Sequence, residues 1–228
     1  GSVRVVGVSA DAGMGKSRLV AEFARTPEDR GMVVAFGECQ AYGSNTSYFV
    51  WREIWSKLFG LDYSASNEER VKALTARLAA IDPALVARTP LLSGVLDLAI
   101  PDNDLTASFD AKLRKTSLEG LLVECLRACA ADAPILLVLE DCHWLDALSR
   151  DLLEALARAA AGLKVMLLLA YRPSTEVGGG LGLASVAHFD EIALAELDGV
   201  HAAQLIRSKL AQMLGTDAEA PAVLVDLI

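Results

Sequence analysis

The chain has 228 residues, with 21 lysines and arginines against 30 aspartates and glutamates and a formal net charge of −9 at pH 7. This acidity argues against direct nucleic-acid binding, because nucleic-acid-binding proteins need basic patches that neutralise phosphates. The hydrophobic fraction of 53% is high, yet no stretch approaches the roughly 18 apolar residues that a membrane-spanning helix needs. Four scattered cysteines and the lack of a secretory-type leader favour a reducing, cytoplasmic setting.

Apolar strands alternate with amphipathic helices along the chain. Short β-branched or apolar runs predict strands at residues 3–8, 32–36, 135–139, 165–170 and 189–194. Helical spacing predicts helices at 16–24, 48–59, 67–81, 111–130, 147–160, 200–213 and from 218 onward, while three prolines predict short helices and loops over 82–110. Strands that are apolar along their whole length are typical of a parallel sheet covered on both faces. We therefore expect an α/β fold.

Residues 10–17 read Ala-Asp-Ala-Gly-Met-Gly-Lys-Ser and lie between the first predicted strand and the helix after it. This is the phosphate-binding P-loop pattern, with alanine in place of its first glycine. Such a loop turns its backbone N–H groups toward phosphates, the lysine reaches the β- and γ-phosphates, and the serine hydroxyl binds Mg²⁺. We expect nucleotide contacts from Ala12, Gly13, Met14, Gly15, Lys16, Ser17 and Arg18.

Two acidic residues, Glu140 and Asp141, directly follow the apolar strand 135–139. Parallel α/β sheets bind ligands at the carboxyl ends of their strands, so this Walker B-like segment is expected beside the P-loop. We expect Glu140 to hold Mg²⁺, mostly through water, and Asp141 to position the attacking water. The usual order in ATPases is aspartate and then glutamate. Because phosphoryl transfer depends on positioning, the shorter Asp141 side chain predicts slow hydrolysis and a long-lived bound nucleotide.

Other classes of P-loop protein fit less well. The chain contains no Asn-Lys-x-Asp segment for guanine and no LSGGQ-like segment, which argues against a GTPase and against an ABC transporter ATPase. Two acids after the strand favour the ATPase branch in which an extra strand separates the P-loop strand from the Walker B strand.

Three blocks of the chain, 13–19 (GMGKSRL), 137–146 (LVLEDCHWLD) and 170–173 (AYRP), resemble the AAA-like STAND ATPases. These modules occur in multidomain bacterial signalling proteins, such as large LuxR-type regulators and proteins with a class III adenylate/guanylate cyclase domain. Segments 39–51 and 113–126 resemble the cyclase-linked members. The resemblance implies a three-layer sandwich around a five-stranded parallel sheet of order 5-1-4-3-2, with the P-loop on the central strand. It also implies that Arg172 senses the γ-phosphate from the end of strand 4.

The resemblance further implies a division into an ATPase core, residues 1–195, and the beginning of a helical lid, residues 196–228. The expected partners are ATP or ADP with Mg²⁺ and the other domains of a longer polypeptide, such as cyclase, helix-turn-helix or repeat domains. Self-association stays open.

The sequence thus favours a regulatory ATPase whose catalytic residues are Lys16, Glu140, Asp141 and Arg172. Two alternatives share the fold: a nucleotide-binding scaffold with negligible turnover, and a DNA-handling AAA+ ATPase, against which the net charge of −9 counts.

Four further features are given structural interpretations. We expect His143 to be a structural hydrogen-bond donor and Trp144 to pack beneath the Walker B turn. Two pairs of residues spaced four positions apart are expected in the core. They are Cys125 with Cys129 and Trp51 with Trp55.

Overall fold

The computed structural model describes residues 5–41, 46–173, 181–183, 186 and 188–214. The chain divides into two compact units, Gly1–Ala193 and Leu194–Ile228. In the second unit, helix α8 (Gly199–Leu214) begins where the Asp198 carboxylate accepts a hydrogen bond from the backbone N–H of His201 at 2.8 Å. The helix expected from residue 218 onward lies outside the described residues. No described helix is long and apolar enough to cross a membrane.

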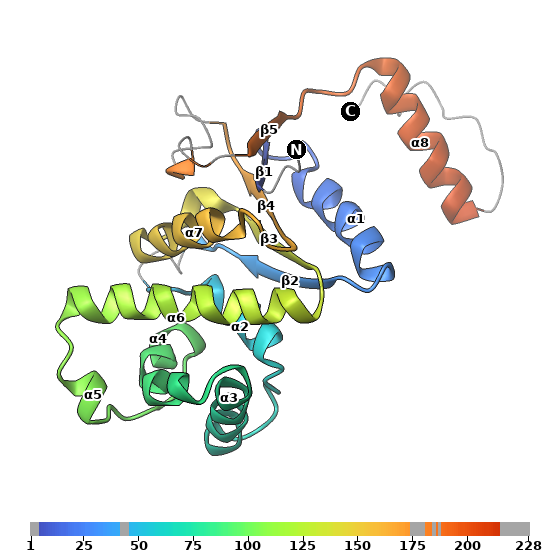
Figure 1. Cartoon of the computed structure of the whole chain (residues 1–228). Helices are drawn as coiled ribbons and strands as arrows, with labels where there is room; N and C mark the ends of the chain where they lie inside the picture. The colour runs from blue at the N-terminus through green and yellow to red at the C-terminus, as the bar shows by residue number, and fades with distance from the viewer. Residues whose placement is uncertain (1–4, 42–45, 174–180, 184–185, 187, 215–228) are drawn as a thin grey trace. The chain divides into compact units, whose positions relative to one another are not determined.

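Five parallel strands form the sheet of the first unit in the order β2-β3-β4-β1-β5, which is the expected 5-1-4-3-2 counted from the other edge (Figure 1). One expectation is corrected: the P-loop strand β1 pairs with β4 and β5, so the middle strand of the five is β4 and not β1. The strands are β1 (Val5–Ser9), β2 (Val33–Glu38), β3 (Ile135–Glu140), β4 (Val165–Tyr171) and β5 (Phe189–Ala193).

The strand order decides how the helices divide between the two faces of the sheet. The connection from β1 to β2 crosses the sheet in one direction, and the connections from β2 to β3, β3 to β4 and β4 to β5 all run in the other. Because parallel crossovers are right-handed, α1 (Lys16–Asp29) covers one face, and α6 (Ala111–Asp132) and α7 (Ala147–Ala160) cover the opposite one.

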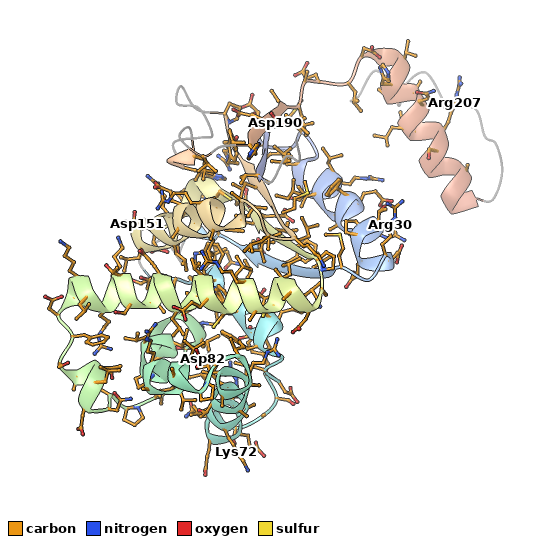
Figure 2. The ribbon with its side chains drawn as sticks, viewed as in Figure 1. Arg30, Lys72, Asp82, Asp151, Asp190 and Arg207 are labelled. Carbon is orange, nitrogen blue, oxygen red and sulfur yellow. The ribbon has the colours of Figure 1, made fainter. Side chains whose placement is uncertain are left out.

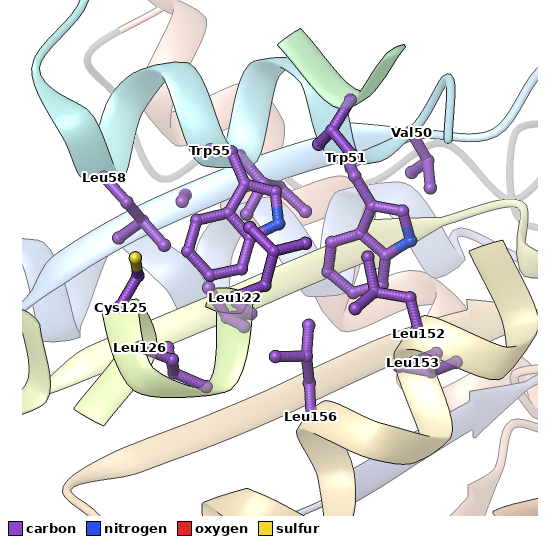
Figure 3. Close-up of a cluster of buried hydrophobic side chains, with 14 of the residues drawn as sticks. Val50, Trp51, Trp55, Leu58, Leu122, Cys125, Leu126, Leu152, Leu153 and Leu156 are labelled. Carbon is purple, nitrogen blue, oxygen red and sulfur yellow. The ribbon is translucent and has the colours of Figure 1, made fainter. Parts of the chain in front are cut away.

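The main core lies between the sheet and the helices α2 (Trp51–Phe59), α6 and α7, as Figure 3 shows. Trp51 and Trp55 of α2 are fully buried against leucines of α6 and α7. The indole N–H of Trp51 also donates to the backbone carbonyl of Ser149 at 3.2 Å, which ties α2 to the start of α7. Cys125 and Cys129 are buried on α6 in the same core. Both core predictions are therefore confirmed.

A helical insertion between α2 and α6 packs against these two helices on the side away from the sheet (Figure 1). It consists of α3 (Asn67–Ile81), the 3₁₀ segment η2 (Pro83–Leu92) and the one-turn helices α4 (Ser93–Leu96) and α5 (Asp104–Ala107). The short elements over 82–110 are those that the prolines predicted. Ser66 and Glu69 form a reciprocal capping box that begins α3. Arg114 of α6 pairs with Asp102 at 3.0 Å, and Lys115 pairs with Asp151 of α7 at 2.6 Å.

Helices flank both faces of the sheet, as expected, and among the described residues of the first unit α1 leaves an apolar groove beside it. Leu19 and Phe23 of α1 and Ile192 of β5 are exposed. They line a wholly apolar groove of about 180 Å³ together with Val6, Val8, Val20, Met166 and Leu168. The reason is topological, because the described helices α6 and α7 of the β2–β3 and β3–β4 crossovers lie on the other face. Part of the chain's high hydrophobic content therefore lines this groove.

Gly37 of β2 provides a test of how tightly α2 packs on the sheet. A Cβ atom at this position would meet the backbone carbonyl oxygen of Val50 and would lie 2.9 Å from Cδ1 of Ile54. Because a backbone carbonyl cannot move aside cheaply, we predict that Gly37→Ala lowers the free energy of unfolding by about 1–3 kcal/mol. The measurement is urea unfolding followed by circular dichroism.

The matched control is Gly120→Ala in the middle of α6, where a Cβ has nothing within 4 Å. This substitution is expected to raise the free energy of unfolding by about 0.5–1 kcal/mol, because alanine has the better helix propensity. Equal effects of the two substitutions would contradict the close approach of α2 to β2.

Candidate functional site

The loop between β1 and α1 has the backbone that its glycines allow. Gly13 and Gly15 both have φ of 84°, in the left-handed region, and Gly15 is the N-cap of α1. Among residues 9–18, these are the positions with positive φ. Ala10, which departs from the P-loop pattern, therefore stands where no left-handed backbone is needed. Ala10 is buried, with 2% of its surface exposed, so the structure has room for its methyl group.

Lys16 is a buried lysine whose ammonium group is held inside the loop. Its Nζ donates to the carbonyl oxygens of Ala10 at 2.6 Å and Asp11 at 2.8 Å. Lys16 is also the first residue of α1, so its charge adds to the positive end of the helix dipole. A glycine-rich loop, a helix N-terminus and an ammonium group are the elements of an anion-binding site.

The loop, the end of β3 and the end of β4 together line a cavity of about 370 Å³. This volume lies within the usual size range of ligand sites. The hydrogen bond from the Ala10 N–H to the Tyr171 carbonyl, at 3.3 Å, joins the start of the loop to the end of β4, which places Arg172 beside it. The lining residues come from the loop and from the ends of β3 and β4: Ala12, Gly13, Gly15, Lys16, Ser17, Arg18, Asp141 and Arg172.

The two acids after β3 have different positions. Asp141 lines the cavity and has φ of 53°, a left-handed conformation that aspartate tolerates better than most residues. Glu140 is half-buried at the last position of β3. Side chains alternate along a strand, and Leu137 and Leu139 point into the core under α2, α6 and α7. Glu140 therefore points to the opposite face, which is the face of α1 and of Ser17.

His143 lies beside Asp141, although it is not among the residues that line the cavity. Neither ring nitrogen has a hydrogen-bond partner among the described residues, which contradicts its expected role as a structural donor. Nδ1 lies 3.9 Å from Oδ1 of Asp141. Burial lowers the pKa of His143; the Asp141 carboxylate opposes this, while the charges of Arg172 and Lys16 lower it further. His143 is therefore a neutral imidazole at neutral pH, close to the charged groups of the cavity. Its position two residues after Asp141 is the sequence feature that indicates this proximity.

Trp144 does not pack beneath the Walker B turn, so that expectation is wrong. Its side chain is 41% exposed, and its ring lies 5.2 Å from that of His143. The 3₁₀ turn η3 (Cys142–Trp144) directs the fully buried Cys142 inward instead. Asp146 is the N-cap of α7, because its carboxylate accepts from the Ser149 N–H at 2.9 Å.

The glycine loop on β1, the parallel sheet and the cavity at the carboxyl ends of its strands together define a P-loop nucleotide-binding protein. Residues 1–169 match the family model described as "AAA ATPase domain". The chain belongs to this family.

A relative comes from Rhizobium meliloti (strain 1021), where it is described as an uncharacterized protein. The two sequences are 30% identical over 176 residues, which are 76% of this chain and 17% of the relative. The chain therefore spans less than a fifth of the length of the curated relative that it matches.

Removal of the Lys16 ammonium group is expected to weaken nucleotide binding. Hydrogen bonds to charged groups contribute about 1.5–3 kcal/mol, so Lys16→Ala should raise the Kd for ADP or ATP by about 10- to 100-fold. Isothermal titration calorimetry measures this change.

Lys72→Ala is the matched control, because Lys72 lies on α3, on the side of the insertion away from the sheet (Figure 2). Its Kd should equal that of the wild type. If Lys16→Ala binds nucleotide as tightly as Lys72→Ala does, the loop is not the phosphate site.

Proposed function

We propose that the chain is the ATP-binding regulatory module of a larger signalling protein, and that it hydrolyses ATP slowly and reports the presence of the γ-phosphate. The observation that carries this proposal is the single cavity that Lys16, Asp141 and Arg172 share. An ammonium group, a carboxylate and a guanidinium group are the side chains needed to hold a phosphate, position a water and sense a terminal phosphate.

The residues at the loop and at the end of β3 fit a magnesium ion. The Ser17 hydroxyl and the Glu140 carboxylate supply the hard oxygen donors that Mg²⁺ prefers, and Glu140 belongs to the face of the sheet that carries α1. In the proposed site these two residues hold the ion. Bound Mg²⁺ neutralises charge on the β- and γ-phosphates.

Asp141 is proposed to orient the attacking water, since it lines the cavity at the end of β3. The order of the two acids supports slow turnover, because the aspartate is one methylene shorter than the glutamate that more commonly stands there. His143 is proposed to help position the Asp141 carboxylate, because its Nδ1 lies 3.9 Å from Oδ1 of Asp141.

Arg172 is proposed as the sensor of the γ-phosphate. A guanidinium group presents a planar fork of donors that matches a phosphate, and Arg172 follows β4 directly. We propose that residues 196–228 begin a helical lid and that the chain is a STAND-type module whose partners are other domains of the same polypeptide. Its coverage of 17% of the relative supports such a multidomain context, while the net charge of −9 counts against a DNA-handling role.

Hydrolysis is tested by phosphate release from the wild type, Asp141→Asn and Lys16→Ala. Asparagine keeps the size and tolerates the left-handed backbone at position 141, so Asp141→Asn should release phosphate about 10-fold or more slowly while it still binds ATP. The wild type should turn over more slowly than about one ATP per second, at the slow end of enzymes.

Asp190→Asn, in the exposed strand β5, is the control and should behave as the wild type. If neither Asp141→Asn nor Lys16→Ala changes the release of phosphate, the chain is a nucleotide-binding scaffold. Turnover of many ATP per second by the wild type would refute slow hydrolysis.

The sensor role of Arg172 is tested by comparing affinities for ATP and ADP. Because only ATP has a γ-phosphate, Arg172→Ala should raise the Kd for ATP by about 10-fold and leave the Kd for ADP nearly unchanged. Arg30→Ala, at the exposed far end of α1 (Figure 2), should change neither value. Equal losses for both nucleotides would show that Arg172 does not distinguish them.

A further inference from the structure

The side chain of Tyr171, the last residue of β4, lies across the neighbouring strand β1. Tyr171 pairs with Ser9 in the register of the two strands, yet the end of its ring lies against Gly7, two residues earlier in β1. A Cβ atom at Gly7 would lie 2.9 Å from both Cε1 and Cζ of Tyr171 and would also meet its hydroxyl oxygen. The Tyr171 side chain is 0% exposed and belongs to the main core. Glycine is therefore required at position 7, because the phenol ring occupies the space of a side chain there.

The backbone of Tyr171 holds the beginning of the P-loop. Its carbonyl oxygen accepts the hydrogen bond from the Ala10 N–H at 3.3 Å. Tyr171 thus contacts the segment of β1 and the P-loop at two points, with its ring at Gly7 and with its carbonyl at Ala10. Because the two points are separated along the chain, together they resist both a shift and a rotation of the end of β4.

Arg172 lies between this anchored residue and a proline. It follows Tyr171 directly and precedes Pro173. A residue before proline is restricted to extended backbone conformations, and proline fixes its own φ near −65°. The backbone of Arg172 is therefore restrained on both sides. Its long side chain, which lines the cavity of the P-loop, starts from a Cα atom with little freedom to move.

We propose that Tyr171 is a positioning residue for Arg172: its ring, packed on Gly7, holds the end of β4 where the Arg172 guanidinium group meets the γ-phosphate. This inference deepens the proposed function and rests on it. The Tyr171 side chain belongs to the core and is not among the residues that line the cavity. Tyr171 therefore affects the terminal phosphate only through Arg172.

The proposal is tested with two substitutions that disturb this contact in different ways. Gly7→Ala pushes the ring away from β1, and Tyr171→Leu removes the ring but keeps an apolar side chain in the core. Because small misplacements of a positioned group weaken its contacts, each should raise the Kd for ATP by about 3- to 10-fold. The Kd for ADP should stay within about a factor of two. Isothermal titration calorimetry with Mg²⁺ measures both values, and circular dichroism checks that each variant is folded.

Tyr171→Phe is the conservative variant. It retains the ring atoms Cε1 and Cζ that lie against Gly7, so it should retain the wild-type ratio of the two Kd values. Loss of the ratio in Tyr171→Phe together with its retention in Tyr171→Leu would overturn the proposal, because the ring would then not be the group that positions Arg172. If Gly7→Ala does not fold, Tyr171→Leu, which introduces no clash at Gly7, decides the outcome.

Leu167→Ala is the matched control for a loss of core packing. Leu167 lies in the same strand and the same core, is also 0% exposed, and pairs with Val5 at the other end of β1. Leu167→Ala should lower the midpoint of urea unfolding and leave the ratio of the Kd values for ADP and ATP unchanged. If it changes this ratio as much as Tyr171→Leu does, the effect is general destabilisation and the proposal is overturned.

A double variant separates positioning from a direct effect on the nucleotide. Because Tyr171 acts through Arg172, Tyr171→Leu/Arg172→Ala should have the same Kd for ATP as Arg172→Ala alone. A further loss in the double variant overturns the proposal. If Arg172→Ala keeps the wild-type ratio, the sensor role in the proposed function fails, and this inference fails with it. If Arg172→Ala loses the ratio while Gly7→Ala and Tyr171→Leu keep it, this inference alone fails.

Discussion

The parallel pairing of β1 with β4 is the constraint on which the candidate site depends. Their register places Ser9 opposite Tyr171, so the P-loop and Arg172 leave the sheet at the same edge. The pairing of β3 with β4 brings Glu140 and Asp141 to that edge as well. Because adjacent strands lie about 4.8 Å apart, side chains far apart in the sequence share one cavity. A register shift of one residue would turn Arg172 to the other face of the sheet.

The same topology explains the distribution of apolar residues. Right-handed crossovers place α6 and α7 on one face, where α2 and the two buried tryptophans complete the core. On the other face α1 leaves a groove that Leu19, Phe23 and Ile192 line. The hydrophobic fraction of 53% therefore reflects two different environments, a closed core and an open apolar groove in the same unit.

The elements were most predictable where local signals agree. The helices α3 and α7 begin and end at the predicted residues, because capping residues precede an amphipathic repeat in both. Helix α1 was predicted to end at Ala24, its last buried residue, but continues through Pro27 to Asp29 in a mostly exposed turn that has no apolar periodicity to predict it. The groove that the described residues form beside α1 could not be predicted from hydrophobicity, because a strand buried on one face and lining a groove on the other is equally apolar.

The sequence by itself determined the chemistry: Gly13, Gly15, Lys16 and Ser17 have the spacing that a phosphate loop requires, and two acids follow an apolar strand. These are local patterns, and the covalent chain keeps their members together. Only the tertiary structure decided that Arg172 and Asp141 share a cavity with Lys16. Those neighbours come from separate strands, and their proximity depends on the order and register of the sheet.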